Sequence, residues 1–224
     1  MDTQVEIMDA QAHLAKVKAF YDEQKEAIET RLQDFRNVWA HGSNKDIHVE
    51  LSFCVLTPQS KAKSAWAAIT AIRDNGLLFN GTPEQIAPFL RSVRFLNNKS
   101  RFLVVLREQM TNNGEIVTKD FFAAMKEPLA MRDWIVNNIK GMSYKEAGHF
   151  IRNVGFGDDI AILDRHILKN LLRLGAIDEI PASLTPRLYL EIEDKMREFC
   201  KNAQIPMASL DLLLWCMEAG EIFK

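Results

Sequence analysis

Apolar side chains recur with helical spacing along most of the chain. Within residues 9–40 they lie three, four or seven positions apart, which predicts one long amphipathic helix. The stripe consists of Leu14, Val17, Tyr21, Ile28, Leu32, Phe35 and Trp39. The run His41-Gly42-Ser43-Asn44 predicts the end of this helix. No segment alternates apolar and polar residues with a period of two, so the pattern predicts an all-α protein.

Capping and breaking residues divide the rest of the chain into shorter helices. The apolar run 50–56 predicts a buried helix rather than a strand. Thr82 followed by Pro83 predicts a helix start, with the helix running toward Arg94. Further helices are expected over residues 97–111, 118–126, 128–138, 143–154, 164–173, 185–202 and 206–218, with turns at 112–114, 155–158 and 178–181.

The segment 139–166, IKGMSYKEAGHFIRNVGFGDDIAILDRH, carries the strongest chemical signal. Residues 140–143 predict a tight hairpin, since Gly141 suits a positive φ and Ser143 is a good N-cap for the helix that follows. The first amides of that helix lack intrahelical partners, so this end of the helix can bind a phosphate.

Two ionisable residues that could take part in catalysis follow the hairpin. Lys145 lies in the first turn of the second helix, and Asp164 comes nineteen residues later as the predicted N-cap of the next helix. An amine can act as a nucleophile, and an ionised carboxylate can stabilise positive charge on a sugar. Each residue alone is usually structural or solvated, so the hypothesis rests on their combination.

This order of features, a helix, a hairpin and a second helix with a lysine, followed by an aspartate, resembles the layout of the helix-hairpin-helix DNA glycosylases that are also AP lyases. Their hairpin usually reads Gly-x-Gly with the lysine two residues later; Gly141, Ser143 and Lys145 match this pattern with Ser in the second Gly position. The resemblance implies that Lys140, Gly141 and Ser143 hold a DNA phosphate. It also implies that Lys145 attacks the sugar and that Asp164 supports the cationic intermediate.

Three further segments resemble the archaeal-type, or type two, 8-oxoguanine DNA glycosylase/AP lyases. They are residues 51–62 (LSFCVLTPQSKA), residues 93–101 (VRFLNNKSR) and the C-terminal tail. The resemblance covers nearly the whole chain and implies two helical subdomains with the active-site cleft between them. Residues 51–155 would form a six-helix domain that contains the helix-hairpin-helix, and residues 1–50 with 156–224 would form the second domain.

The same resemblance assigns four residues to the damaged nucleotide and its surroundings. Gln59 would fill the gap left by the flipped nucleotide. The terminal carboxylate of Lys224 would accept the N7 proton that 8-oxoguanine has and guanine lacks. Trp215 and Phe95 would stack on the flipped base. The alternative that Trp215 and Phe95 are core residues, and that Gln59 is an ordinary loop residue, stays open here.

Composition narrows the class of protein. The 224 residues are 47% hydrophobic and 26% charged, as in globular domains, and no run of 18 apolar residues predicts a membrane span. Three dispersed cysteines, Cys54, Cys200 and Cys216, predict buried thiols and cannot supply the four ligands of an iron–sulfur cluster. We therefore expect no cofactor and no metal site, with the hairpin as a candidate site for a monovalent cation.

Charge along the chain favours a DNA-binding face in the middle. Residues 51–173 carry 17 basic and 11 acidic side chains, whereas acidic residues are in excess in the segments on either side. Together with the resemblance, this implies double-stranded DNA containing 8-oxoguanine or abasic sites as the partner of a cytoplasmic, nucleoid-associated monomer.

The resemblance thus implies a bifunctional 8-oxoguanine DNA N-glycosylase and AP lyase that works through a lysine Schiff base and β-elimination. Two alternatives stay open at this point. One is a glycosylase/lyase for oxidised pyrimidines resembling endonuclease III, and the other is a helix-hairpin-helix module that binds DNA without catalysis.

Overall fold

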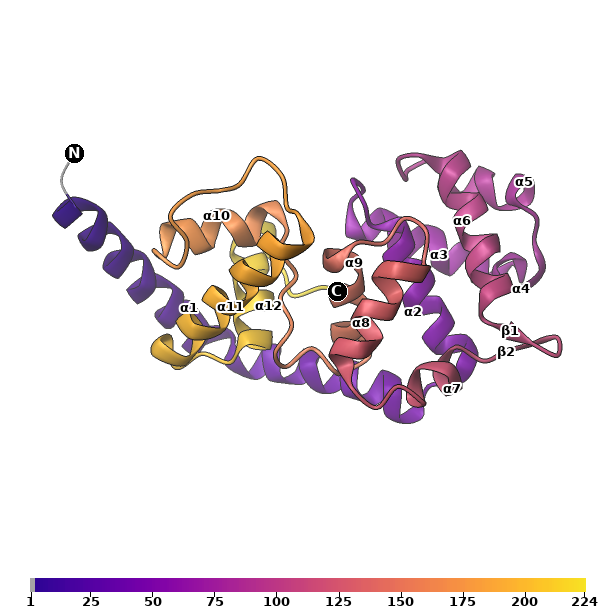
Figure 1. Ribbon diagram of the computed structural model, residues 1–224, viewed down its shortest axis with the longest axis horizontal. Helices are drawn as coiled ribbons and strands as arrows, with labels where there is room; N and C mark the ends of the chain where they lie inside the picture. Colours follow the sequence, from indigo (N-terminus) through magenta and orange to yellow (C-terminus); the bar gives the residue numbers. More distant parts are fainter. Residues whose placement is uncertain (1–2) are drawn as a thin grey trace. The chain divides into compact units, whose positions relative to one another are not determined.

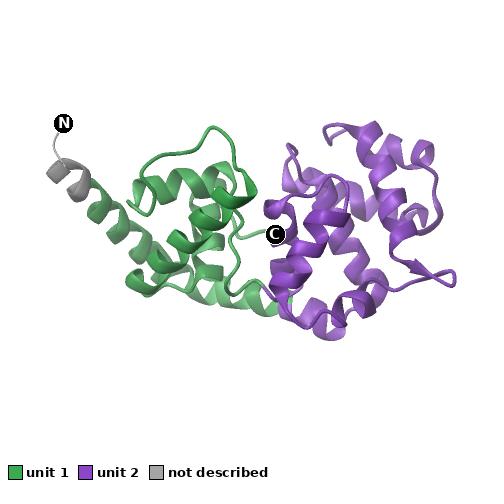
Figure 2. Cartoon of the chain, in the orientation of Figure 1, with its two compact units in different colours: residues 1–35, 157–224 green, residues 36–156 purple. Residues whose placement is uncertain are grey.

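The computed structural model describes residues 3–224, with side chains from Asp9 onward. The chain divides into two compact units: unit 1 comprises residues 1–35 and 157–224, and unit 2 comprises residues 36–156 (Figure 2). Over the described residues it forms twelve α-helices, one short 3-10 helix and a small two-stranded sheet (Figure 1). The predicted all-α class is confirmed.

Unit 2 is built around a buried helix. Its elements after α1 are α2 (Asn44–Leu56), α3 (Ala62–Asp74), α4 (Leu77–Asn80), α5 (Pro83–Ile86), the 3-10 helix η1 (Ala87–Leu90), α6 (Leu96–Gln109), β1 (Thr111–Asn112), β2 (Glu115–Ile116), α7 (Thr118–Ala123), α8 (Pro128–Asn138) and α9 (Tyr144–Asn153). α2 packs against α3, α6, α7 and α9. Every α2 residue from Ile47 to Leu56 is buried, as expected for a helix surrounded by others.

The start of α2 and its link to α9 are fixed by polar contacts. The Ser43 amide donates to Asp46 Oδ2 at 2.7 Å, and the Asp46 amide donates to Ser43 Oγ at 3.3 Å, which is a capping box. The hydrogen bonds from Ser43 lower the pKa of the Asp46 carboxyl. Farther along α2, the buried Glu50 accepts a hydrogen bond from Asn153 Nδ2 at 3.2 Å. This contact ties α9 to the central helix.

Unit 1 combines the first part of α1 (Thr3–His41) with α10 (Arg165–Arg173), α11 (Pro186–Ala203) and α12 (Met207–Ala219). The predicted long helix is confirmed, and its stripe residues Val17, Tyr21, Ile28 and Phe35 are buried. α10 packs against α12. Near the end of α12, Glu218 Oε1 accepts hydrogen bonds from Asn170 at 3.2 Å and Arg173 at 3.3 Å, so the end of α12 is fixed to α10.

The structure corrects two predicted boundaries. Unit 2 begins at Arg36 rather than at residue 51, because α2 makes its packing contacts with helices of unit 2. The helix expected from Pro83 toward Arg94 is also wrong in length: α5 ends at Ile86 and η1 ends at Leu90. Pro88 lies inside this stretch and has no amide proton, which favours a short 3-10 turn over a continuing α-helix.

Four elements were absent from the predicted set, namely α3, α4, β1 and β2. α3 carries Ala65, Ala68, Ile69 and Ile72 on its buried face, at the spacing of an amphipathic helix. α4 is a single turn. The predicted turn at 112–114 joins β1 and β2 into a hairpin, and Asn113 and Gly114 both have positive φ, as a type I′ turn requires.

Candidate active site

The helix-hairpin-helix of unit 2 is formed by α8, the connection 139–143 and α9, and the two helices pack together. Gly141 has φ +85°, and a Cβ at this position would lie 2.8 Å from the Phe102 ring of α6. Any other residue would therefore be strained in its backbone and would collide with Phe102. Lys140, Gly141 and Ser143 are exposed, as a phosphate-binding hairpin requires.

Ser143 is the N-cap of α9, as predicted. Its amide donates to Glu146 Oε2 at 3.2 Å, and its hydroxyl donates to the same carboxylate oxygen. This pairing explains why serine can replace the glycine usual in related hairpins: the residue has φ −114°, which needs no glycine, and its hydroxyl binds the first turn of α9.

Lys145 follows in the first turn of α9, where 28% of its side chain is exposed. Its Nζ lies 3.3 Å from Glu146 Oε1. An amine can attack carbon only when its lone pair is free, so this ion pair must open before Lys145 acts as a nucleophile. Glu146 thus caps the helix through Oε2 and holds the lysine through Oε1. Sequence reasoning did not single out Glu146, although its place three residues after Ser143 is the signature of a capping box.

Asp164 in unit 1 is the N-cap of α10, as predicted. Its Oδ1 accepts hydrogen bonds from the amides of His166 and Ile167, both at 2.8 Å. With Oδ1 used by the helix, Oδ2 is the oxygen that can face a sugar. An acidic side chain is thus well suited to cap a helix at this position.

The segment before Asp164 is held by two residues of α11 that sequence reasoning missed. Tyr189 Oη accepts a hydrogen bond from the Leu163 amide at 3.1 Å and donates one to the Ala161 carbonyl at 2.8 Å. The Ala161 amide donates to Glu193 Oε1 at 2.8 Å. These buried contacts fix the backbone immediately before Asp164, and therefore the position of its carboxylate.

Gln59 and Phe95 lie on two exposed turns of unit 2. Gln59 has φ +53° and follows Pro58, and the Ser60 amide donates to the Thr57 carbonyl at 3.0 Å, as in a type II turn. Phe95 has φ +61° and directly precedes α6, and 52% of its surface is exposed. This exposure excludes the core alternative for Phe95.

Lys99 of α6 lies beneath the turn that carries Gln59, and sequence reasoning did not single it out. Only 3% of Lys99 is exposed. Its Nζ donates to the carbonyls of Leu56 at 2.8 Å and Pro58 at 2.7 Å, and to Ser60 Oγ at 3.1 Å. Burial lowers the pKa of Lys99 to about 8. The Glu146 carboxylate raises this pKa and the Lys145 ammonium lowers it, which shows that Lys99 senses the charges at the start of α9.

The lowered pKa gives Lys99 a measurable effect on stability. Between pH 8 and 10.5 the unfolded chain keeps a proton that the folded chain has lost, so the free energy of unfolding rises with pH. We expect the difference in unfolding free energy between the natural chain and Lys99→Met to shift by about 2 kcal/mol in favour of the natural chain from pH 7 to pH 10. Urea titrations at the two pH values measure it. An unchanged difference would show that the pKa of Lys99 is not lowered.

Trp215 and Lys224 belong to the C-terminal part of unit 1. Trp215 on α12 is half-buried, whereas its neighbours Leu214 and Cys216 are buried. Lys224 is also partly buried. The predicted residues therefore fall into two sets: Lys145, the hairpin, Gln59 and Phe95 in unit 2, and Asp164, Trp215 and Lys224 in unit 1.

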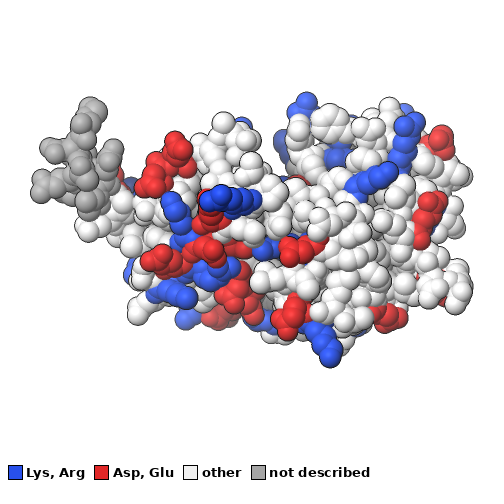
Figure 3. Space-filling view, in the orientation of Figure 1, with Lys and Arg blue, Asp and Glu red and all other residues white. Residues whose placement is uncertain are grey.

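The charge also differs between the units. Unit 2 carries 16 basic and 10 acidic side chains, whereas unit 1 carries 12 basic and 20 acidic ones. On the face seen in Figure 3, acidic and basic side chains are interspersed over unit 1, and much of unit 2 bears neither. The basic excess thus belongs to the unit that contains the hairpin, as expected for a phosphate-binding surface.

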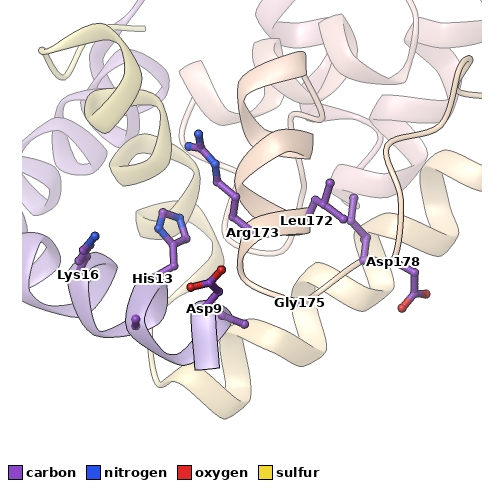
Figure 4. A pocket seen from close by; sticks show the side chains of 10 residues that line it. Asp9, His13, Lys16, Leu172, Arg173, Gly175 and Asp178 are labelled. Atoms are coloured by element: carbon purple, nitrogen blue, oxygen red, sulfur yellow. The ribbon is translucent and has the colours of Figure 1, made fainter. Parts of the chain in front are cut away.

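Unit 1 also contains a pocket, and of the described residues that line it only Arg173 has been discussed so far (Figure 4). Asp9, His13 and Lys16 line it from α1, and Arg173 and Asp178 line it from α10 and the segment that follows. Its charges are mixed, and none of the predicted site residues is among the described residues that line it. It therefore adds nothing to the candidate active site.

Residues 3–224 contain neither a membrane-spanning helix nor a cluster of metal-binding side chains. No described helix has the length and apolar character needed to cross a membrane. The described residues also contain no cluster of three or more His, Cys, Asp or Glu side chains suited to a metal ion. Cys54, Cys200 and Cys216 are buried, as predicted, and form no disulfide.

Comparison with known proteins connects this geometry to one family. The family model described as "8-oxoguanine DNA glycosylase" matches residues 28–205. A Fusobacterium nucleatum protein named "8-oxoguanine DNA glycosylase/AP lyase" is 57% identical over 217 residues, which cover 97% of this chain and 100% of that protein.

Two crystal structures of the 8-oxoguanine DNA glycosylase of Methanocaldococcus jannaschii are also similar. One has a TM-score of 0.83 at 33% identity and covers 94% of this chain and 95% of that one. The other, solved with a 15mer DNA containing 8-oxoguanine, has a TM-score of 0.81 at 32% identity and covers 94% and 99%. The similarity therefore extends over both units.

Proposed function

The chain belongs to the 8-oxoguanine DNA glycosylase family and is a DNA repair glycosylase and AP lyase, and from this premise we propose that Lys145 is its nucleophile and Asp164 its electrostatic partner. The position of Lys145 carries the proposal. It lies in the first turn after a hairpin whose exposed residues can bind a DNA phosphate, and the unit around it has a basic excess. A phosphate held there would place the adjacent sugar near the amine.

The chemistry follows from these two groups. The Lys145 amine attacks C1′ of the damaged nucleotide, the N-glycosidic bond breaks, and the base leaves with the bonding electrons and takes up a proton. Positive charge grows on the sugar during this step, and the Asp164 carboxylate stabilises it. Ring opening and proton loss from nitrogen convert the adduct to a Schiff base at C1′. Loss of the C2′ proton then expels the 3′ phosphate by β-elimination and cuts the strand.

The other residues would select and hold the damaged nucleotide. Lys140, Gly141 and Ser143 would bind the backbone phosphate without reading sequence. Gln59 has both donors and acceptors on its amide and would occupy the space of the flipped nucleotide. Phe95 and the half-buried Trp215 would stack on the extruded base, which is worth about 1–3 kcal/mol for each base.

The two alternatives left by the sequence are not retained. A non-catalytic DNA-binding module does not fit a chain whose full-length relative is named as a glycosylase and lyase. An enzyme for oxidised pyrimidines does not fit a family described by 8-oxoguanine.

The remaining expectations stay predictions. The lysine amine supplies the nucleophile, so the proposed reaction needs no cofactor. The monovalent cation at the hairpin, the monomeric state and a cytoplasmic location with the nucleoid are proposed on the sequence and the resemblance.

Borohydride trapping tests the proposed function. A duplex with 8-oxoguanine is mixed with the protein and sodium borohydride, which reduces a Schiff base to a stable amine. We expect a covalent protein–DNA product with the lesion duplex and none with the matching guanine duplex. A strand cut without a trapped product would exclude the lysine mechanism.

The terminal carboxylate gives a separate prediction about selectivity. If Lys224 accepts the N7 proton of 8-oxoguanine, deleting it or adding a C-terminal tag should lower excision of the lesion by roughly tenfold to a hundredfold, as loss of one buried hydrogen bond to a charged group does. Lys224→Ala keeps a terminal carboxylate and should lose less. The measurement is single-turnover release of 8-oxoguanine beside cleavage of an abasic duplex. Equal losses on both substrates would mean that the tail is structural.

A further inference from the structure

The buried Lys99 uses all of its hydrogen-bonding capacity on one short segment. A protonated lysine has three N–H donors and no acceptor. Its three acceptors are the Leu56 and Pro58 carbonyls and the Ser60 hydroxyl oxygen, all within 3.1 Å. The ammonium therefore clamps the turn that carries Gln59 at three points, on both sides of that residue.

Ser60 extends the clamp to the second exposed turn. Its Oγ also accepts a hydrogen bond from the Arg94 amide at 3.1 Å. Arg94 directly precedes Phe95, and the Arg94 guanidinium carbon lies 5.5 Å from the centre of the Phe95 ring. The Lys99 amide in turn donates to the Phe95 carbonyl at 2.9 Å. Lys99 and Ser60 thus contact both turns.

Both turns need such support because each has an unfavourable backbone conformation. Gln59 and Phe95 have φ of +53° and +61°, in the left-handed region that residues with a Cβ rarely adopt. Such conformations persist only where the surrounding structure holds them. Here the hydrogen bonds of Lys99 and Ser60 supply part of that support. The side chains of Gln59 and Phe95 remain exposed.

We propose that Lys99 and Ser60 form a positioning pair that holds Gln59 and Phe95 in one fixed arrangement for extracting the damaged base. The proposal rests on the roles that the proposed function gives to Gln59 and Phe95. Lys99 itself does not touch the reacting atoms; it acts through the two turns. A fixed arrangement lets gap filling and base stacking occur together, without the cost of ordering two separate turns on the DNA.

The buried charge supports a role beyond folding. Burial disfavours the ammonium, as the lowered pKa of Lys99 shows, and an apolar side chain would avoid that cost. A lysine at this place is understandable if its three directed donors are required. The same donors cannot be supplied by an apolar side chain of equal length.

Comparing two substrates separates positioning from a general loss of structure. We expect Lys99→Met to lower single-turnover excision of 8-oxoguanine by about tenfold or more, as expected when one base-stacking contact is lost. Cleavage of a preformed abasic site should fall much less, because it has no base to hold and its sugar is easily extruded. Lys126→Met makes the same change at an exposed lysine of unit 2 and should stay within about twofold on both substrates.

Combining variants tests whether Lys99 acts through Phe95. Phe95→Ala alone should lower excision, and adding it to Lys99→Met should lower excision little further, because the contact is already lost. If Lys99 and Phe95 acted independently, the fold-losses of the two single variants would multiply in the double variant. If Lys99→Met does not fold, Ser60→Ala makes the same test, since it removes the link between the turns and leaves the two carbonyl bonds of Lys99. Ser60→Thr keeps the hydroxyl and should restore excision of 8-oxoguanine.

The proposal is overturned by equal losses on both substrates, by multiplying effects with Phe95→Ala, or by full excision activity in folded Lys99→Met or Ser60→Ala. Failure of the proposed function is distinguishable from these results. It would be seen in the natural chain itself, as the absence of a borohydride-trapped product on the lesion duplex.

Discussion

Replacing Lys145 with glutamine should abolish base release and borohydride trapping, with a fall of roughly three orders of magnitude or more in single-turnover rate. The amide has no basic lone pair, so neither attack on C1′ nor a Schiff base is possible. Binding of the lesion duplex should change little, because the hairpin residues remain and the lost charge is already paired with Glu146. Gel shifts beside trapping assays measure the two effects.

Lys140→Gln is the matched control for this experiment. It removes the same charge from an exposed hairpin lysine five residues earlier. We expect it to weaken duplex binding and to reduce its salt dependence, since one phosphate contact is lost. Trapping at saturating protein should remain. If Lys145→Gln still traps DNA as the natural chain does, another amine is the nucleophile.

Replacing Asp164 with asparagine should slow base excision by about a hundredfold to a thousandfold, the range seen when one preorganised stabilising group is removed. The neutral amide cannot balance positive charge on the sugar. Stability should hardly change, because the asparagine oxygen can accept the two hydrogen bonds that Oδ1 of Asp164 now accepts. The rate of single-turnover excision measures the effect of the lost charge, and thermal unfolding measures the effect on the helix cap.

Two further variants complete this test. Asp164→Ala loses both charge and cap and should lower the free energy of unfolding by about 0.5–2 kcal/mol. Thr185 is the N-cap of α11, and its hydroxyl accepts a hydrogen bond from the Leu188 amide at 3.3 Å. Thr185→Ala removes this cap and changes no residue of the candidate site. It should destabilise unit 1 while keeping the rate of the folded enzyme. If Asp164→Asn is as active as the natural chain, Asp164 serves only as a helix cap.

The helices and the proposed catalytic pair, Lys145 and Asp164, could be predicted from the sequence because their signals are local. The apolar stripe of α1 repeats every one or two helical turns, and the caps at Ser143 and Asp164 each involve residues of a single turn. The break at Pro88 was missed because the favourable start at Thr82-Pro83 was extended too far. The placement of Gln59 and Phe95 on turns with positive φ was not predictable, because neither residue type favours that conformation.

The supporting residues were missed for a different reason. Lys99 shares the buried face of α6 with Leu103 and Leu106, at helical spacing, and a charged residue on such a face is the signal that could have found it. Glu193 on α11 occupies the same kind of position, next to Ile192 and Met196. Their partners are backbone atoms far away in sequence, so the fold had to be known before their roles could be assigned.

The three buried cysteines have a consequence for the conditions under which this enzyme works. Its lesion, 8-oxoguanine, is guanine that has been oxidised, so the enzyme is needed most when oxidants are abundant. Oxidants attack the thiolate rather than the thiol. Burial raises the pKa of Cys200 to about 12 and also raises that of Cys216, and Cys54 is fully buried. The thiols are thereby protected from the agents that create the substrate, and the proposed nucleophile, an amine in place of a thiol, would avoid the same damage.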